Sequence, residues 1–216
     1  MRGVIFDFDG VLVDSEAVHE AAIRRVAEPL GMTFTHDRFV NEFVGTTDEH
    51  CFRTLASSFE KPLPDDQLRQ LIEEKRAGYH ELLRQGEVKP YPGSVELARA
   101  LAQRGPLGLC SGSHRETVLP TLERLSIQHL FTTIVTSDSV AKPKPDPEGY
   151  RLATERLGLE PGQVSAIEDS PPGAKAATAA GLRVFVVGHT FPAARFPSGT
   201  RYAQRIADLN ADELLQ

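Results

Sequence analysis

Five short apolar runs, separated by stretches with helical character, limit most strongly what this chain can fold into. The runs cover residues 4–7, 107–111, 133–136, 164–167 and 184–187. Each run is nearly continuous in apolar or β-branched residues, which is typical of strands buried on both faces of a parallel sheet. Because strands and helical segments alternate along the chain, the sequence predicts a doubly wound α/β core with mainly parallel strands.

Three of the expected helices carry recognisable end signals. Residues 94–104 open with Ser94 as the expected N-cap and stop at Gly105. Asp146-Pro147 supplies a cap and a first-turn proline for a helix that reaches about Leu157. Ser170-Pro171 repeats this arrangement before an alanine-rich helix that ends at Gly181. These helices are expected to connect consecutive strands of the sheet.

The stretch 15–85 interrupts the alternation of strands and helices. It has helical patterns, such as Val18, Ala22 and Val26 at a spacing of four, but no convincing strand. We therefore expect an α/β core formed by residues 1–14 and 86–216, with a helical cap inserted at 15–85. This is a core that is discontinuous in the sequence.

Composition excludes several classes of function. The 216 residues carry a net charge of −6 without a long run of one sign, which argues against binding nucleic acid through a basic face. No apolar stretch approaches the roughly 20 residues that span a bilayer, and the first apolar run is too short for a signal peptide. Cys51 and Cys110 lack metal-ligand spacing. A cytoplasmic protein with reduced thiols is expected.

Polar residues follow several of the predicted strands at the point where each strand ends. Asp7-Phe8-Asp9-Gly10 follows the first, Ser111-Gly112-Ser113 the second and Glu168-Asp169-Ser170 the fourth. A loop that reads Lys-Pro-Lys-Pro-Asp, residues 142–146, precedes the fourth strand. Each feature alone has an ordinary explanation as a turn, a helix cap or a solvated lysine. Because the carboxyl ends of parallel strands converge on one crevice, their joint occurrence predicts a functional site there.

These elements resemble the four motifs of the haloacid dehalogenase superfamily, in its phosphatase and phosphomutase branch. Residues 7–14 match the pattern Asp-x-Asp-Gly-x-Leu-x-Asp, and Ser111 matches the second motif. Residues 142–146 match Lys-Pro-x-Pro-Asp, which selects Lys142 over Lys144 as the active-site lysine. Glu168, Asp169, Ser170 and Gly173 match the acidic fourth motif. The resemblance covers the whole core, and the insertion resembles the helical cap of this family.

The resemblance implies a Mg²⁺-dependent hydrolase of phosphate esters. A carboxylate nucleophile splits one difficult displacement into two easier ones, and hard oxygen ligands suit Mg²⁺. Asp7 is the implied nucleophile and Asp9 the implied general acid and base, after the turn that Gly10 permits. Asp7 and Asp169 are the implied metal ligands, together with the Asp9 backbone carbonyl and Glu168, which binds directly or through water. Lys142, Ser111 and the Gly112 backbone N–H are expected to contact the phosphate, with Ser113 and His114 beside them.

The cap is expected to close over this site and to contact the leaving group. Its candidate substrate-binding residues are His19, the loop Gly45-Thr46-Thr47, and Lys75 with Tyr79 one turn later. Candidate hinges lie near Asp14-Ser15 and in residues 86–92. For His19 and Lys75, an ordinary place on a solvated helix surface remains the alternative.

A β-phosphoglucomutase-type mutase is the main alternative, because that branch shares the His19 and Lys75 positions. Two departures favour a simple phosphatase: Asp48 stands where the mutases carry an arginine, and His114 where they carry a lysine. An acid cannot bind the second phosphate of a sugar bisphosphate. A non-catalytic binding module, a receiver domain and a dehalogenase are further rivals. The expected partner is a small phosphorylated metabolite, sugars or sugar acids among the candidates, and the expected state is a monomer.

Overall fold

The computed structural model describes residues 1–44, 46–86 and 88–216. The chain divides into two compact units. The first joins Met1–Asp14 to Lys89–Gln216, and the second is Ser15–Val88. The two units are described separately below.

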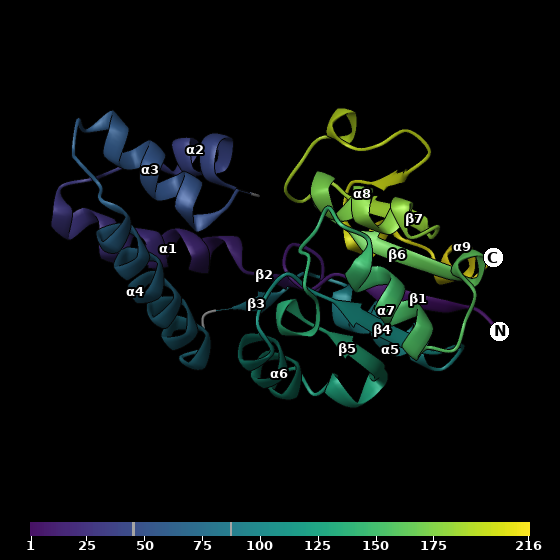
Figure 1. The fold of residues 1–216 in the computed structure, drawn as a ribbon. Helices are drawn as coiled ribbons and strands as arrows, with labels where there is room; N and C mark the ends of the chain where they lie inside the picture. Colours follow the sequence, from purple (N-terminus) through teal and green to yellow (C-terminus); the bar gives the residue numbers. More distant parts are fainter. Residues whose placement is uncertain (45, 87) are drawn as a thin grey trace. The chain divides into compact units, whose positions relative to one another are not determined.

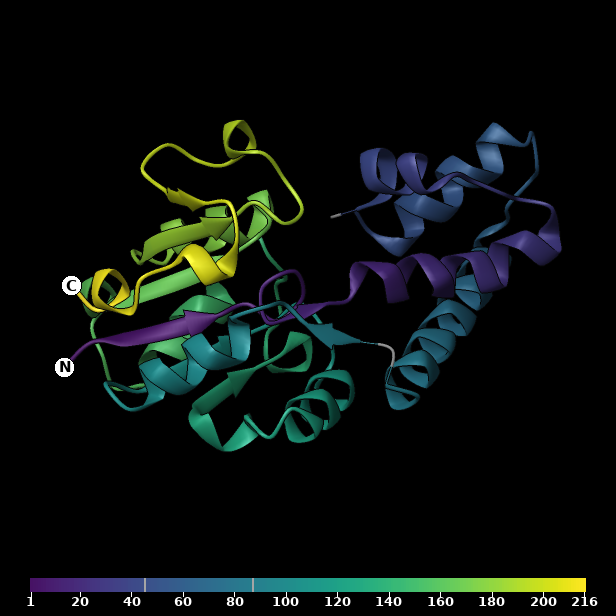
Figure 2. The ribbon, with the colours of Figure 1, turned by 180° about the vertical axis from the view of Figure 1, so that it is seen from behind.

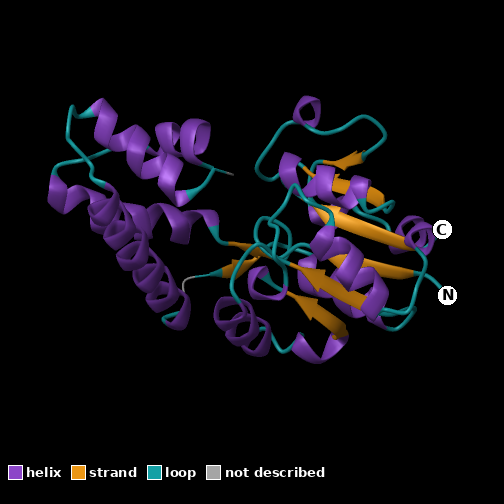
Figure 3. Cartoon of the chain, viewed as in Figure 1, coloured by secondary structure: helices purple, strands orange, loops and turns teal. Residues whose placement is uncertain are grey.

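A six-stranded sheet forms the centre of the first unit (Figure 3). Its order is β5-β4-β1-β6-β7-β8, and each neighbouring pair is parallel. The strands are β1 (Gly3–Phe6), β4 (Leu107–Cys110), β5 (Phe131–Val135), β6 (Val164–Glu168), β7 (Arg183–Val187) and β8 (Arg201–Ala203). From β1 the chain continues to β4 and β5 on one side of β1, and then to β6, β7 and β8 on its other side. The carboxyl end of β1, between β4 and β6, is therefore the switch point at which such sheets place their ligands.

Helices cover both faces of this sheet. The helices are α5 (Ser94–Ala102), α6 (Arg115–Arg124), α7 (Glu148–Arg156), α8 (Pro171–Ala179) and α9 (Ala211–Leu214). Helices α7 and α8 lie on one face, whereas α5 and α9 lie on the other (Figures 1 and 2). Alternate residues of β1 therefore enter different layers of the core, and Ile5 packs with the α7 and α8 side chains Ala153 and Ala177. Burial of both faces explains why the strands read as continuous apolar runs.

The expected doubly wound fold is confirmed, and some element limits differ from those expected. Strand β5 begins at Phe131, two residues before the expected start, and β8 was not expected at all. Strand β8 is short and mostly exposed, so it lacks the apolar run that marks the other strands. Ser94 is the first residue of α5 and not its cap, because its hydroxyl donates a hydrogen bond to the Leu12 carbonyl at 2.8 Å. Gly93, in a left-handed conformation, occupies the cap position.

A short antiparallel ribbon lies where the chain leaves and re-enters this unit. It pairs β2 (Val13–Asp14) with β3 (Lys89–Pro90). The turn that separates β1 from β2 is closed by hydrogen bonds from the Gly10 amide to the Val13 carbonyl and from the Leu12 amide to the Phe8 carbonyl, both at 2.9 Å. The turn after β1 thus has a defined backbone path, which sets the position from which the Asp9 side chain projects.

The regular elements described in the second unit are all helical. The unit contains α1 (Glu16–Ala27), α2 (His36–Arg38), a π-helical turn η2 (Phe39–Phe43), α3 (Asp48–Ser58) and α4 (Asp65–Arg84). Six short 3₁₀ turns complete the described elements of the chain. One of them, Glu28–Leu30, belongs to this unit, and the other five belong to the first unit: Gln128–Leu130, Ser137–Ser139, Pro161–Gln163, Ala193–Arg195 and Ile206–Asp208. Helices α1 and α4 pack against each other, and the aromatic side chains of Phe39 and Phe52 anchor a separate apolar core. Among the helices described, none combines the length and apolar character that crossing a membrane requires.

Candidate active site

Asp7 is the first residue after β1, at the carboxyl end of the sheet. The backbone amide of Asp7 continues the sheet by donating to the Ile167 carbonyl at 2.9 Å, which fixes the Cα position. Its side-chain Oδ1 accepts the Phe8 amide at 2.8 Å, and only 6% of the residue is exposed. The carboxylate is therefore held in one orientation by the backbone around it.

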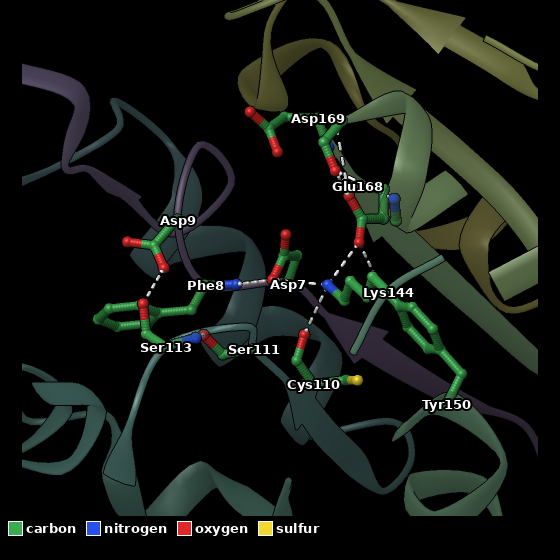
Figure 4. A network of polar contacts seen from close by, with 12 residues as sticks. Asp7, Phe8, Asp9, Cys110, Ser111, Ser113, Lys144, Tyr150, Glu168 and Asp169 are labelled. Carbon is green, nitrogen blue, oxygen red and sulfur yellow. Dashed lines mark hydrogen bonds and ion pairs between the residues drawn. The ribbon is translucent and has the colours of Figure 1, made fainter. Parts of the chain in front are cut away.

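Three buried acids from two neighbouring strands meet at this edge (Figure 4). Asp7 follows β1, while Glu168 ends β6 and Asp169 follows it; one carboxylate oxygen from each lies within 4.8 Å of the others. Three carboxylates so close together repel one another unless positive charge lies among them. Burial and the Glu168 carboxylate raise the pKa of Asp7 to about 8, although Lys144 opposes this rise. Carboxylate oxygens in this arrangement suit a hard divalent cation such as Mg²⁺.

Lys144, and not Lys142, is the lysine of this cluster. The Lys144 Nζ lies 3.0 Å from Asp7 Oδ1 and 2.6 Å from Glu168 Oε1, and it donates to the Cys110 carbonyl at 3.0 Å. Burial alone would lower its pKa, but the two carboxylates raise it well above the ordinary value for lysine. The side chain of Lys142 is 72% exposed and only approaches Asp146, at 3.9 Å. The expectation that Lys142 lies beside Asp7 is therefore wrong.

The loop before α7 explains this correction. The carboxylate of Glu148 accepts the backbone amides of Ala141 and Lys142 at 2.9 and 3.0 Å, which holds the start of the loop away from the acids. The chain reads Lys-Pro-x-Pro-acid twice, once from Lys142 and once from Lys144. The pattern that starts at Lys142 ends at Asp146, whereas the pattern that starts at Lys144 ends at Glu148. This overlap in the sequence was the available signal that Lys142 is not the only candidate.

Glu168 is fully buried, and both of its carboxylate oxygens accept hydrogen bonds. Its Oε1 accepts Lys144 and the Tyr150 hydroxyl, the latter at 2.7 Å. Its Oε2 accepts the amides of Asp169 and Ser170 and the Ser170 hydroxyl, at 3.0–3.3 Å. Glu168 therefore serves first to orient Lys144 and the turn that carries Asp169. The contribution of Tyr150, on α7, was not anticipated from the sequence.

The turn after β4 lies beside Asp9. The Ser113 hydroxyl donates to Asp9 Oδ2 at 2.6 Å, and the Ser113 amide donates to Ser111 Oγ at 2.9 Å. Ser111 is buried while Gly112 is exposed. Gly10 has φ of 74°, and a Cβ there would lie 1.9 Å from an oxygen of Asp169, so this position admits only glycine. The structure thus brings together Asp7, Asp9, Gly10, the Ser111–Ser113 turn, Glu168 and Asp169.

His114 is not part of this cluster of contacts. It is the N-cap residue of α6, and its exposed imidazole binds the Asp138 carboxylate through Nδ1. Asp138 also accepts the Arg115 amide at 2.7 Å. The contacts of His114 therefore secure the start of α6, and a role in binding substrate stays a prediction.

In the helical unit, a polar cluster joins α1, α3 and α4. The Lys75 Nζ contacts Asp48 Oδ1 at 2.7 Å and His19 Nδ1 at 3.0 Å, while the His19 ring stacks on Tyr79 with centroids 4.2 Å apart. Lys75 is only 4% exposed, so it is not a solvated surface lysine. Burial and the Lys75 charge lower the pKa of His19 well below the ordinary value.

The loop before α3 shows structural contacts for two of its predicted substrate-binding residues. Thr47 caps α3 by accepting the His50 amide at 3.2 Å, and the Thr46 hydroxyl donates to the Phe43 carbonyl at 2.7 Å. Gly45, the first residue predicted for this loop, lies outside the described residues. Substrate contacts of Thr46, Thr47, His19 and Lys75 remain predictions.

Two residues beyond β7 also contact the site, although no motif pointed to them. The Thr190 hydroxyl donates to Asp169 Oδ2 at 2.5 Å. His189 Nδ1 lies 2.8 Å from the Gly10 carbonyl oxygen. They follow the last apolar run as ordinary loop residues, so only their position in space connects them with the site.

Comparison with known proteins identifies the family. Residues 4–187 match the model of the haloacid dehalogenase-like hydrolase family, and the chain belongs to that family. The chain is 35% identical, over 88% of its length and 87% of the relative's, to a phosphorylated carbohydrates phosphatase of Thermotoga maritima. It is 28% identical to the fructose-1-phosphate phosphatase of Escherichia coli, over 83% and 93% of the two chains. A solved structure from Thermotoga maritima, described as a β-phosphoglucomutase, aligns with a TM-score of 0.75 at 32% identity and covers 96% of each chain.

Proposed function

We infer that this protein is a Mg²⁺-dependent phosphatase that hydrolyses a small phosphorylated metabolite, such as a sugar phosphate, through an aspartyl-phosphate on Asp7. The observation that carries the proposal is the Asp7 carboxylate, held at the switch point of the sheet between the Lys144 ammonium and the acids Glu168 and Asp169. The phosphatase relatives, two of which act on phosphorylated carbohydrates, support the reaction and the substrate class.

The donor set fits a divalent cation. Three buried carboxylates and one ammonium leave an excess of negative charge, which Mg²⁺ would neutralise while also compensating the charge of a bound phosphate. Asp7 and Asp169 would hold the ion through their side chains, and Asp9 through its backbone carbonyl. Because both oxygens of Glu168 already accept several hydrogen bonds, we assign it a supporting contact through water.

The reaction proceeds in two displacements at phosphorus. In the first, an oxygen of Asp7 attacks the phosphorus atom while the bond to the leaving oxygen breaks, and Asp9 gives its proton to that oxygen. In the second, Asp9 takes a proton from water, and the water oxygen attacks the phosphorus of the aspartyl-phosphate, which releases phosphate and restores Asp7. Lys144 neutralises charge between nucleophile and phosphate. Ser111 and the Gly112 amide would donate hydrogen bonds to phosphate oxygens.

The mutase alternative is less well supported by the contacts within the helical unit. Asp48 directs its carboxylate to Lys75 at 2.7 Å, so the charge of that buried lysine is already compensated. An arginine at position 48 would instead leave two cations for a second phosphate group. Supplying β-glucose 1-phosphate distinguishes the two reactions, because a phosphatase releases phosphate and a mutase forms glucose 6-phosphate.

Two substitutions test the covalent step. Asp7→Asn should abolish hydrolysis of p-nitrophenyl phosphate, while its unfolding temperature in EDTA should be unchanged or higher because one of three repelling buried carboxylates is removed. Asp9→Asn should accumulate radiolabelled, hydroxylamine-sensitive phosphoenzyme, because hydrolysis of the acyl phosphate lacks its base. Asp37→Asn, on the exposed surface of the helical unit, is the matched control and should behave as wild type. Labelling of the Asp7→Asn protein would refute the nucleophile.

A further inference from the structure

His189 connects four segments of the first unit that are remote in sequence. Its Nδ1 lies 2.8 Å from the Gly10 carbonyl oxygen, and its Nε2 accepts the Ile206 amide at 3.2 Å. Its ring stacks on Tyr91 with centroids 3.8 Å apart and an angle of 19° between the planes. The residue itself follows β7. One imidazole thus joins the turn after β1, the return of the chain near β3 and the segment before α9.

The hydrogen bonds assign a neutral ring with a defined tautomer. A carbonyl oxygen can only accept, so Nδ1 must carry the proton, and a backbone amide can only donate, so Nε2 must be unprotonated. Burial also lowers the pKa of His189 below the ordinary value, in keeping with a neutral imidazole. Both nitrogens are therefore committed to the backbone.

The Gly10 carbonyl is a sensitive place for such a contact. Gly10 adopts a φ of 74°, and its amide donates to the Val13 carbonyl at 2.9 Å while its Cα packs against the Asp169 carboxylate. The Gly10 amide belongs to the peptide that joins Asp9 to Gly10, and the Gly10 carbonyl belongs to the next peptide. Because both groups are hydrogen-bonded, the peptides on either side of the Gly10 Cα are held, and neither can rotate alone. The Asp9 carboxylate accepts a hydrogen bond from the Ser113 hydroxyl at 2.6 Å. The direction of Asp9 therefore depends on the backbone turn as well as on Ser113.

We propose that His189 is a positioning residue for Asp9: it donates to the Gly10 carbonyl and thereby aims the Asp9 carboxyl at the leaving-group oxygen. The proposal rests on the proposed function of Asp9 as general acid. It predicts a specific defect, since a misplaced general acid matters most when the leaving group is a poor one. An alkoxide must be protonated as it departs, whereas p-nitrophenolate is stable without a proton.

The experiment compares kcat/KM for p-nitrophenyl phosphate with kcat/KM for an alkyl phosphate, glycerol 1-phosphate. This parameter covers only the steps up to departure of the leaving group. His189→Phe keeps a ring against Tyr91 but removes both hydrogen bonds. His189→Asn retains an amide N–H close to the position of Nδ1. His129→Phe, at an exposed position of the same unit, is the matched control.

His189→Phe should lower kcat/KM for glycerol 1-phosphate by about 10–100-fold and that for p-nitrophenyl phosphate by less than about 3-fold. His189→Asn should recover most of the loss, and the control should change neither value. If His189→Phe does not fold, His189→Gln, whose donor is displaced by one methylene, should show the same selective loss. Equal losses on both substrates, or no rescue by asparagine, would overturn the proposal. If the wild type hydrolyses neither substrate, it is the proposed function that fails.

Discussion

Replacing Lys144 and Lys142 in turn by methionine separates two lysines that lie two residues apart. Lys144 Nζ makes ion pairs of 3.0 and 2.6 Å with Asp7 and Glu168, in a site where its own side chain is 16% exposed. At an effective dielectric constant of about 20, each pair is worth roughly 5–6 kcal/mol before desolvation is subtracted. Removing one partner of a buried pair costs about 3–5 kcal/mol, because the remaining charge is left without compensation.

Lys144→Met should therefore lower the free energy of unfolding by about 3 kcal/mol, the lower end of that range, since Asp7 can take up a proton in the variant. It should lower kcat for p-nitrophenyl phosphate by about 10²–10³-fold, as expected for the loss of one charge-stabilising group in a buried site. Lys142→Met removes only a side chain that is 72% exposed and 3.9 Å from Asp146. It should change stability by less than about 0.5 kcal/mol and kcat by less than about 2-fold.

Urea unfolding in EDTA measures the first quantity, and initial rates with saturating Mg²⁺ measure the second. The reasoning fails if Lys142→Met loses activity while Lys144→Met keeps it, because the register of the loop before α7 would then be the one first expected from the sequence. Comparable losses in both variants would also contradict it, since one lysine is buried among acids and the other is in solvent.

Two further predictions concern Thr190 and His19. Thr190→Val removes the hydroxyl that donates to Asp169 at 2.5 Å, and it should raise the Mg²⁺ dissociation constant by about 10-fold or more. Calorimetric titration and the Mg²⁺-induced rise in unfolding temperature measure this constant, and an unchanged value would contradict the prediction. The pKa of His19 is lowered by burial and by Lys75, so below pH 6.5 the unfolded chain binds a proton that the folded chain does not. The free energy of unfolding should consequently decrease as the pH falls below 6.5, by at most about 1.4 kcal/mol per pH unit from this group, and His19→Asn should flatten that slope; equal slopes in the two proteins would count against it.

Much of the sheet could be predicted because its signals are local. The strands β1, β4, β6 and β7 are nearly continuous apolar runs, and the polar residues that follow β1, β4 and β6 stand in fixed positions relative to those runs. Strand β8 was missed because Arg201–Ala203 is short, polar and mostly exposed, and only pairing with β7 makes it a strand. The cap of α5 was misassigned because a serine before a helix looks the same whether its hydroxyl binds the helix or a distant carbonyl.

The cluster in the helical unit lay beyond what periodicity could decide. The pattern of α4 is compatible with a lysine in solvent at position 75, and the long side chain of lysine makes that the usual outcome. Lys75 can be buried because two other helices place Asp48 and His19 beside its ammonium group. Asp48 accepts a hydrogen bond from this group, and His19 contacts it. Their approach depends on how three helices pack, which no single segment of the chain encodes.

By itself, the order of apolar runs and polar strand ends determined the α/β class and placed Asp7, Asp9, Ser111, Glu168 and Asp169 at a common edge, because strand direction and periodicity are properties of short segments. Tertiary structure alone decided which of two lysines joins those acids, and that His189, Thr190 and Tyr150 support them. Those contacts join residues that lie as much as 179 positions apart in the sequence, as His189 and Gly10 do. Whether two such groups meet depends on the packed path of every loop between them, so local sequence cannot specify it.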